Sequence, residues 1–437
     1  MCVLGALVSV NIFLLAYELS GRHLVAVLTW LALAFSNPLW TYSLVIFPEI
    51  AAALLLLYTV RKLAIGWSMN TPSQWLLVGL AIGFLPWLSW RYAILSVTAF
   101  LYFLAGWRFH AGDKSDGNER SAFPSGGLVA PWKKLSRVSW ALVAAPVGVS
   151  ALLLAAYSWF IYGRPIPPPS IPELGGTLPF VLPWSGLGDL QEFARGSLGL
   201  FFDRQAGLFP LAPIYILSFG GLLLGLASPV GWVRRIFGAS CFLATPYVLA
   251  TGAYYFWNGS WAPPARMITV VAPLGAAGLA LLLASSPRRS PTWPLLLVTT
   301  TVGMLVMGVM VANPLSMWPI SSPFKLISES PALPFRERGF NLFEGLPAFS
   351  SLFEAGESSL PWQLVACLAG SGLLVALCLS FAYSEPVRPA RIWRTRRIPL
   401  LGLLAAIFGG SMLGLVPGEH GRVRAQERAS RSAALAN

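Results

Sequence analysis

The sequence has little charge for its length. Of its 437 residues only 11% are Asp, Glu, Lys or Arg, and 56% are hydrophobic. An average soluble domain carries about 25% charged residues, so this chain has too few charges to cover a water-soluble fold of its size. Apolar runs follow one another with short polar gaps almost from end to end. This pattern predicts an all-α, polytopic bundle of transmembrane helices rather than two or three soluble domains.

Cysteine, histidine and the common enzyme motifs are also scarce. The four cysteines are scattered without CxxC spacing, which is typical of small core hydrophobes. The three histidines lie far apart, and their spacing favours interfacial side chains over metal ligands. The sequence contains no GxxxxGK[ST], HExxH or GxSxG motif and no convincing dinucleotide fingerprint. These absences exclude several frequent classes of soluble enzyme.

About twelve apolar runs are candidates for membrane spans. Several are shorter than the roughly 20 residues that a perpendicular helix needs. The predicted spans are 1–17, 24–38, 42–60, 75–90, 91–107, 138–162, 209–228, 236–255, 266–285, 293–312, 362–383 and 398–416. We therefore expect one bundle over residues 1–416, followed by a disordered basic tail over 417–437.

The net charge of +13 is concentrated in alternate connectors, such as Arg61 and Lys62 or Arg234 and Arg235. This is the positive-inside pattern, and it predicts a multi-pass protein of the cell membrane, as in the bacterial cytoplasmic membrane. Anionic membrane lipids, and not nucleic acid, are the expected partners of these charges. The orientation makes 108–137 a cytoplasmic linker and 163–208 and 313–361 extracytoplasmic loops.

Glu49 follows Pro48 at the start of an apolar run that the orientation opens on the outer side. A carboxylate in or near hydrocarbon is unfavourable by a few kcal/mol unless it is paired or lines a wet cavity. Glu49 is therefore a candidate site residue. The alternative is a cap, because an acid in the first turn of a helix suits the helix dipole.

The outer segment 254–266 combines aromatic residues with Arg266. A guanidinium group at the mouth of a helix can bind a phosphate bidentately, while rings such as Tyr255, Trp257 and Trp261 contact a sugar. An aromatic belt with a snorkelling arginine is the alternative interpretation.

A third segment, 199–213, carries Asp203 and Arg204 ahead of Gly207. The three residues predict a turn that local charge pairing fixes before the next helix. A structural role is favoured for this segment.

At these three segments the sequence resembles the GT-C superfamily of polytopic glycosyltransferases, which includes protein mannosyltransferases and aminoarabinose transferases. The resemblance rests on the pattern and order of Pro48-Glu49, Gly207-Leu208-Phe209 and the Trp-Gly-rich turn from Trp257 to Arg266. It covers roughly residues 1–285. It implies sugar transfer at the outer face from a polyprenyl-phosphate-linked donor to a lipid, glycan or protein acceptor.

The resemblance also implies roles for individual residues. Glu49 matches a second acidic position that helps arrange the catalytic site, sometimes through a divalent metal, and Arg266 would face the donor phosphate. Tyr255, Trp257, Trp261, Asp203 and Arg204 are the further candidates for substrate binding. They would line the same outer face.

The sequence departs from the family pattern at its start. The family places an acidic pair in the first outer loop as the general base, but no acidic residue precedes Glu18 here. We therefore expect a truncated chain that is inactive as it stands, or a degenerate homologue. A transporter or lipid flippase with about twelve spans, or a noncatalytic membrane scaffold, are the alternatives.

Overall fold

The computed structural model is helical throughout the part of the chain that it describes, with no β-strand in that part. The described residues are 1–64, 71–109, 137–165, 187–203, 207–228, 230–254, 262–287 and 290–312. The helices are α1 (Cys2–Ser20), α2 (His23–Ala34), α3 (Leu39–Leu44), α4 (Glu49–Ala64), α5 (Pro72–Leu88), η1 (Trp90–Tyr92), α6 (Ala93–Phe109), α7 (Arg137–Tyr162), α8 (Leu187–Phe202), α9 (Leu208–Leu211), α10 (Ile214–Leu226), α11 (Gly231–Gly252), η4 (Ala272–Leu274), α12 (Gly275–Ser285) and α13 (Thr292–Ala312). The prediction of an all-α fold is confirmed over these ranges.

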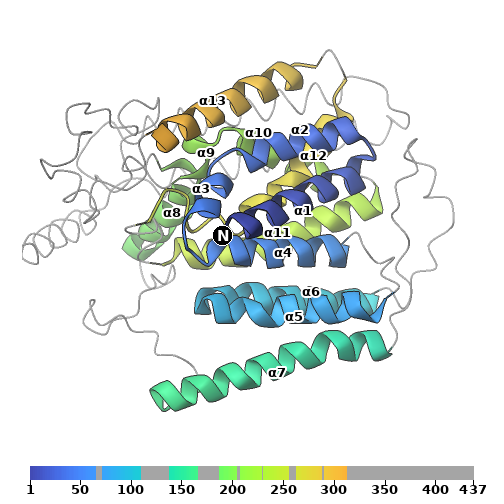
Figure 1. Ribbon diagram of the computed structural model, residues 1–437, viewed down its shortest axis with the longest axis vertical. Helices are drawn as coiled ribbons and strands as arrows, with labels where there is room; N and C mark the ends of the chain where they lie inside the picture. The colour runs from blue at the N-terminus through green and yellow to red at the C-terminus, as the bar shows by residue number, and fades with distance from the viewer. Residues whose placement is uncertain are drawn as a thin grey trace, which may run out of the picture.

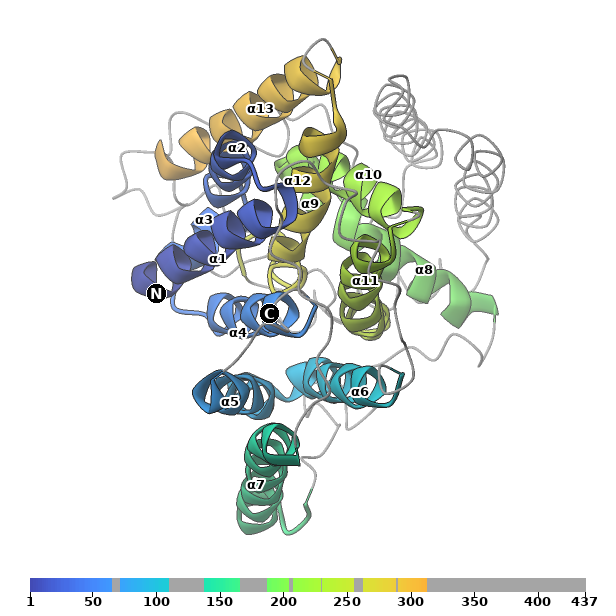
Figure 2. The ribbon, with the colours of Figure 1, turned by 90° about the vertical axis from the view of Figure 1, so that its right-hand side faces the viewer.

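Most of the long helices lie side by side in a stack (Figure 1). Helix α13 lies at one end of the stack and α7 at the other, with α2, α1 and α4 between them. The view turned by 90° shows α5 and α6 as neighbours between α4 and α7 (Figure 2). Side-by-side helices with apolar sequences are the arrangement expected of a membrane bundle.

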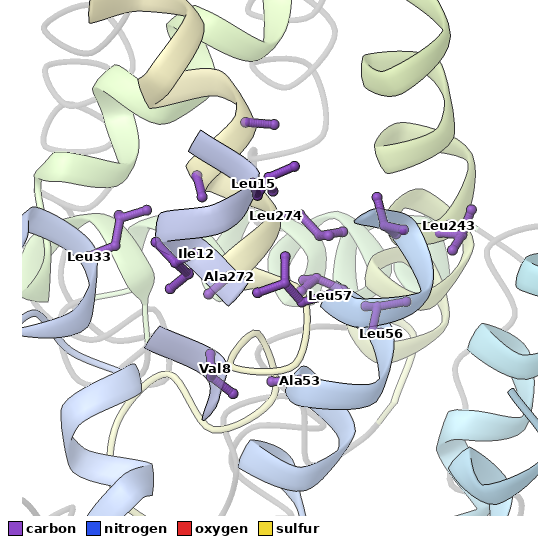
Figure 3. Packing of buried hydrophobic residues seen from close by; sticks show 14 of the residues in the cluster. Val8, Ile12, Leu15, Leu33, Ala53, Leu56, Leu57, Leu243, Ala272 and Leu274 are labelled. Atoms are coloured by element: carbon purple, nitrogen blue, oxygen red, sulfur yellow. The ribbon is translucent and has the colours of Figure 1, made fainter. Parts of the chain in front are cut away.

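The core lies where α1, α4 and α12 meet α2 and α11 (Figure 3). On α1 the buried residues Val8, Ile12, Leu15 and Leu19 recur at the spacing of one helix face. They pack near Leu57 of α4 in one continuous cluster. This cluster fixes the start of α4 and thereby the position of Glu49.

Glycines let several helices approach closely. A Cβ atom added to Gly221 of α10 would lie 1.8 Å from the carbonyl oxygen of Gly278 in α12. Gly79 and Gly83 of α5 form a GxxxG step against α7, where a Cβ atom on Gly79 would lie 2.7 Å from the Val143 carbonyl oxygen. Small residues at helix contacts are typical of bundles in lipid, where close van der Waals packing drives association.

The outward faces of the helices are apolar. On α7, Phe160 is 85% and Leu152 is 72% exposed. Two helices, Cys2–Ser20 and Val138–Tyr162, are long and apolar enough to cross a membrane, and six shorter apolar helices of the described chain accompany them. A soluble protein rarely exposes such a surface, so the chain is membrane-associated.

The structure corrects the bounds of three predicted spans. The run 42–60 divides into α3 and α4, and the run 209–228 divides into α9 and α10, because a proline stands in each break. In the run 266–285, regular helix begins only at Gly275, after an irregular segment and η4.

Other predicted segments lie partly or wholly outside the described residues. The predicted outer loop 163–208 contains α8 and the start of α9. The predicted spans 362–383 and 398–416, the loop 313–361, the tail 417–437 and nearly all of the linker 108–137 lie outside the described residues.

Candidate functional site

The candidate site is centred on Glu49, the first residue of α4. The chain leaves α3 at Leu44, and Pro48 precedes the new helix, so the carboxylate lies at a break between two helices. The Glu49 side chain is 0% exposed. Both interpretations of the sequence apply to it, because it opens a helix and is also a buried charge with cationic partners.

Two arginines from distant parts of the chain donate to the same oxygen of Glu49. Arg266 Nε donates to Oε1 at 2.7 Å, and Arg91 Nη2 donates to this atom as well. Both arginine side chains are 25% exposed, whereas the carboxylate is fully buried. The structure therefore brings the predicted residues Glu49 and Arg266 together and adds Arg91.

Arg91 lies in η1, the short turn between α5 and α6. Its Nη2 also donates to the Tyr92 hydroxyl at 2.8 Å, and its Nη1 donates to Sδ of Met267 at 2.6 Å. The guanidinium carbon is 4.9 Å from the centroid of the Tyr92 ring, a cation–π contact. These contacts hold the cation toward Glu49 and toward the segment that carries Arg266.

Arg266 lies on the irregular, largely buried segment that precedes η4. Ala265, directly before it, has φ 59°, a left-handed conformation that a residue with a Cβ atom seldom adopts. The guanidinium carbon of Arg266 is 4.5 Å from the centroid of the Phe47 ring. The strained turn and the ring together direct Arg266 toward Glu49.

Two buried tyrosines fasten this irregular segment to the bundle. The Tyr42 hydroxyl of α3 donates to the carbonyl oxygen of Pro263, and the Tyr247 hydroxyl of α11 donates to that of Met267 at 2.8 Å. Non-helical backbone at membrane depth is tolerated where protein groups satisfy it. The two tyrosines thus provide hydrogen-bond donors to backbone carbonyl groups on both sides of Arg266.

The electrostatic balance of the three residues is positive. Two guanidinium groups and one carboxylate carry a net charge of +1, and the two cations reach the surface while the anion does not. Oε2 of Glu49 and Nε of Arg91 are buried, and neither forms a hydrogen bond within the described part of the chain. A partly exposed pair of cations with unused donors is suited to bind an anion.

The geometry does not suit a divalent metal at Glu49. The only carboxylate of this cluster already faces two guanidinium groups, which would repel a dication. No group of three His, Cys, Asp or Glu side chains within the described ranges is close enough together to hold a metal ion. The residues present thus do not fit the metal that the resemblance implies.

Of the other predicted site residues, the structure describes Asp203 but not the remaining four. Asp203 is buried at the end of α8, and the backbone N–H of Gly207 donates to its carbonyl oxygen at 2.8 Å. A Cβ atom on Gly207 would lie 2.4 Å from that oxygen, so the turn requires glycine. Arg204, Tyr255, Trp257 and Trp261 lie outside the described residues. Their predicted roles in substrate binding stay predictions.

Sequence reasoning missed Arg91, although a signal was present. The residue stands between Trp90 and Tyr92 on a connector that the orientation places outside. Basic residues are depleted on that side by the positive-inside rule, so an outer arginine calls for a partner. Arg266 breaks the rule in the same way.

An apolar groove of about 450 Å³ lies between α4, α5 and α7. On α4 it is lined by Leu54, Leu55 and Tyr58. At 3.6 residues per turn these lie on the face of α4 opposite Glu49. The groove is therefore separate from the charged cluster.

Comparison with known proteins gives one sequence relationship. No family model matches the chain, and no solved structure matches it. A stretch of 136 residues is 35% identical to the protein FATTY ACID EXPORT 4, chloroplastic, of Arabidopsis thaliana. The stretch makes up 29% of this chain and 72% of that protein.

Proposed function

Over that stretch the chain belongs to the family of the chloroplast fatty acid export protein, and we propose that it is a multi-pass membrane protein that binds a lipid with an anionic headgroup. We further propose that it acts as a glycosyltransferase, with a polyprenyl-phosphate-linked sugar as donor and a lipid, glycan or protein as acceptor. The site would lie at the outer face of the cytoplasmic membrane.

One observation carries the proposal. Arg91 and Arg266 share a single buried oxygen of Glu49 and both reach the surface, so the cluster presents a net positive charge at one end of an apolar bundle. Arginine binds phosphate well because its planar donors match the phosphate oxygens. A phosphate joined to an apolar tail fits this site, because the phosphate complements the positive charge and the tail complements the apolar helices.

The proposed transfer breaks one bond of the sugar and forms another. The bond between the anomeric carbon of the sugar and the phosphate oxygen breaks, a bond from that carbon to the acceptor oxygen forms, and the proton of the acceptor hydroxyl passes to the departing lipid phosphate. The lipid phosphate leaves with the electron pair of the broken bond. Arg266 and Arg91 would stabilise the charge that develops on the leaving phosphate.

Release of the lipid product tests the proposal without knowledge of the acceptor. Proteoliposomes that contain the full chain would be incubated with farnesyl-phosphate mannose, glucose or aminoarabinose and with a total membrane extract as the source of lipid, glycan and protein acceptors. Free farnesyl phosphate would be measured by chromatography. We expect release above that of empty liposomes with at least one donor, and less than one tenth of it with Arg266→Ala. No release with any donor, from protein that still binds farnesyl phosphate, would refute the transfer and leave only the lipid binding.

A second candidate function is transport of a fatty acid or a related lipid. The sequence relationship to a fatty acid export protein favours it, since a fatty acid is also an anionic group on an apolar tail. Uptake of labelled oleate into the same proteoliposomes, with no release of farnesyl phosphate, would favour this carrier over the glycosyltransferase.

A further inference from the structure

Arg91 is the part of the cluster to which the sequence resemblance gives no role. We propose that Arg91 binds the same anionic headgroup as Arg266, and that Glu49 is a positioning residue which holds the two guanidinium groups together without touching the ligand. The inference rests on the proposed function only in taking the ligand to be an anionic lipid. It requires no sugar transfer.

The hydrogen bonds of Arg266 leave most of its donors available. A guanidinium group has five N–H donors. Only Nε of Arg266 donates to Glu49, and within the described chain neither terminal nitrogen has a side-chain or backbone acceptor. An anion can therefore be bound by the two terminal nitrogens while Nε keeps its bond to the carboxylate.

Arg91 has fewer unused donors than Arg266, but an anion can replace the acceptor of its weakest hydrogen bond. Its Nη2 serves both Glu49 and the Tyr92 hydroxyl, whereas its Nη1 donates to the thioether sulfur of Met267. A thioether is a weak acceptor, and a charged oxygen is a much stronger one. An incoming anion is expected to displace the sulfur and to leave the other contacts of Arg91 intact.

Glu49 is placed to hold the arginines rather than to react. Its Oε1 receives both cations, and its Oε2 is fully buried. A general base must come within hydrogen-bond reach of the proton that it removes, and neither oxygen of Glu49 is open to a substrate hydroxyl in this arrangement. Without the carboxylate, the two like charges would repel each other.

Two variants that preserve the net charge of +1 test the two parts of the inference. The double variant Glu49→Gln/Arg91→Gln keeps one arginine and removes one charge of each sign. Glu49→Asp keeps the charge but withdraws the carboxylate by one methylene. For both we expect the Kd for farnesyl phosphate, measured in a neutral detergent, to rise about tenfold or more, since each variant removes or misplaces hydrogen bonds to a charged group.

The matched control is Glu18→Gln/Arg61→Gln, the same exchange at an ion pair on the opposite end of α4. It should bind farnesyl phosphate within twofold of the wild type. Farnesol, which lacks the phosphate, should not compete. Oleate as competitor reports whether a carboxylate headgroup can replace the phosphate, and competition by it would assign the same two arginines to either anion.

Each part can fail separately. Suppose that the double variant elutes normally in size-exclusion chromatography and has a Kd within twofold of the wild type. Arg91 would then have no part in binding the headgroup. The same result for Glu49→Asp would overturn the positioning role of Glu49. An equal loss in the control variant, or equal binding of farnesol, would overturn the whole inference. Because the probe carries no sugar, retained binding without transfer would contradict only the glycosyltransferase.

Discussion

Two ion-pair clusters lie at opposite ends of α4, and they use their hydrogen bonds differently. At the C-terminal end, both oxygens of Glu18 accept from Arg61, at 2.8 and 2.7 Å, and the third nitrogen of Arg61 donates to Asn11 at 2.9 Å. At the other end, one oxygen of Glu49 accepts from two arginines, and its second oxygen has no partner in the described chain. The first cluster is neutral and the second carries a charge of +1.

The difference indicates separate roles. A neutral, fully hydrogen-bonded pair stabilises the contact of α1 with α4 and offers nothing further to a ligand. An unbalanced cluster with unused donors is a poor way to join helices, because buried groups without partners are unfavourable by about 1–3 kcal/mol each. Such an arrangement is expected where a ligand completes the bonding.

The largest expected effect comes from removing each acid in turn. Glu49→Ala leaves two neighbouring cations without a counter-ion and should lower the free energy of unfolding by about 3–5 kcal/mol. Glu18→Ala leaves one arginine, whose side chain can turn toward the interface, and should lower it by about half as much. Unfolding of both variants by SDS titration in mixed micelles measures the difference.

Addition of farnesyl phosphate sharpens this test. At a concentration well above its raised Kd, the anion should restore stability to Glu49→Ala, where it neutralises the two arginines that have lost their carboxylate, and should leave the stability of Glu18→Ala unchanged. If both variants lost the same free energy of unfolding, or if farnesyl phosphate stabilised both, the two clusters would not differ as described.

A smaller effect is expected from the cluster of Glu18, Arg61 and Asn11. Asn11→Ala removes the acceptor of Arg61 Nη1 and also the bond from Asn11 Nδ2 to the Leu7 carbonyl oxygen. Since the acceptor serves a charged donor, we expect a loss of about 2 kcal/mol in the free energy of unfolding. Lipid binding should stay at the wild-type level. A change in binding would mean that the cluster around Arg61 also contributes to the ligand site.

Tyr42→Phe tests the hydrogen bond that supports the segment carrying Arg266. The substitution leaves the Pro263 carbonyl oxygen buried without its donor, and we expect a loss of about 1–2 kcal/mol in stability. Because Arg266 lies on the same segment, binding of farnesyl phosphate should weaken a few-fold as well. Tyr58→Phe, at the apolar groove between α4, α5 and α7, is the control and should alter neither quantity. Loss of stability with unchanged binding would show that the Tyr42 hydrogen bond does not position Arg266 for the ligand.

The sequence predicted the helices better than the site. Apolar periodicity and proline positions located most helices to within a few residues, because burial in lipid or in the core leaves a regular pattern. Glu49 and Arg266 could be selected as charges in apolar surroundings. Their pairing could not, since 217 positions separate them and only the packing of α4 against the segment before η4 joins them.

Arg91 was missed for a related reason. It stands at the boundary between two predicted spans, where a single arginine is usually read as part of a turn. Its role depends on the fold of η1, which directs the side chain toward Glu49 and Met267. The residues around Arg91 in the sequence do not indicate where its side chain points. The irregular segment before η4 likewise depends on tertiary bonds, from Tyr42 to Pro263 and from Tyr247 to Met267.

The smallest expected effect is of opposite sign and concerns Ala265, the residue that turns the chain into Arg266. Its φ of 59° is unfavourable for alanine by roughly 1 kcal/mol, and glycine adopts this conformation freely. Ala265→Gly should therefore raise the free energy of unfolding by up to about 1 kcal/mol, less the greater entropy of glycine in the unfolded chain. Ala253→Gly, at the C-cap of α11 with φ −75°, is the control and should not stabilise. If the turn serves only to direct Arg266, the stabilised variant should bind farnesyl phosphate as the wild type does, whereas weaker binding would show that the strain itself keeps the arginine at Glu49.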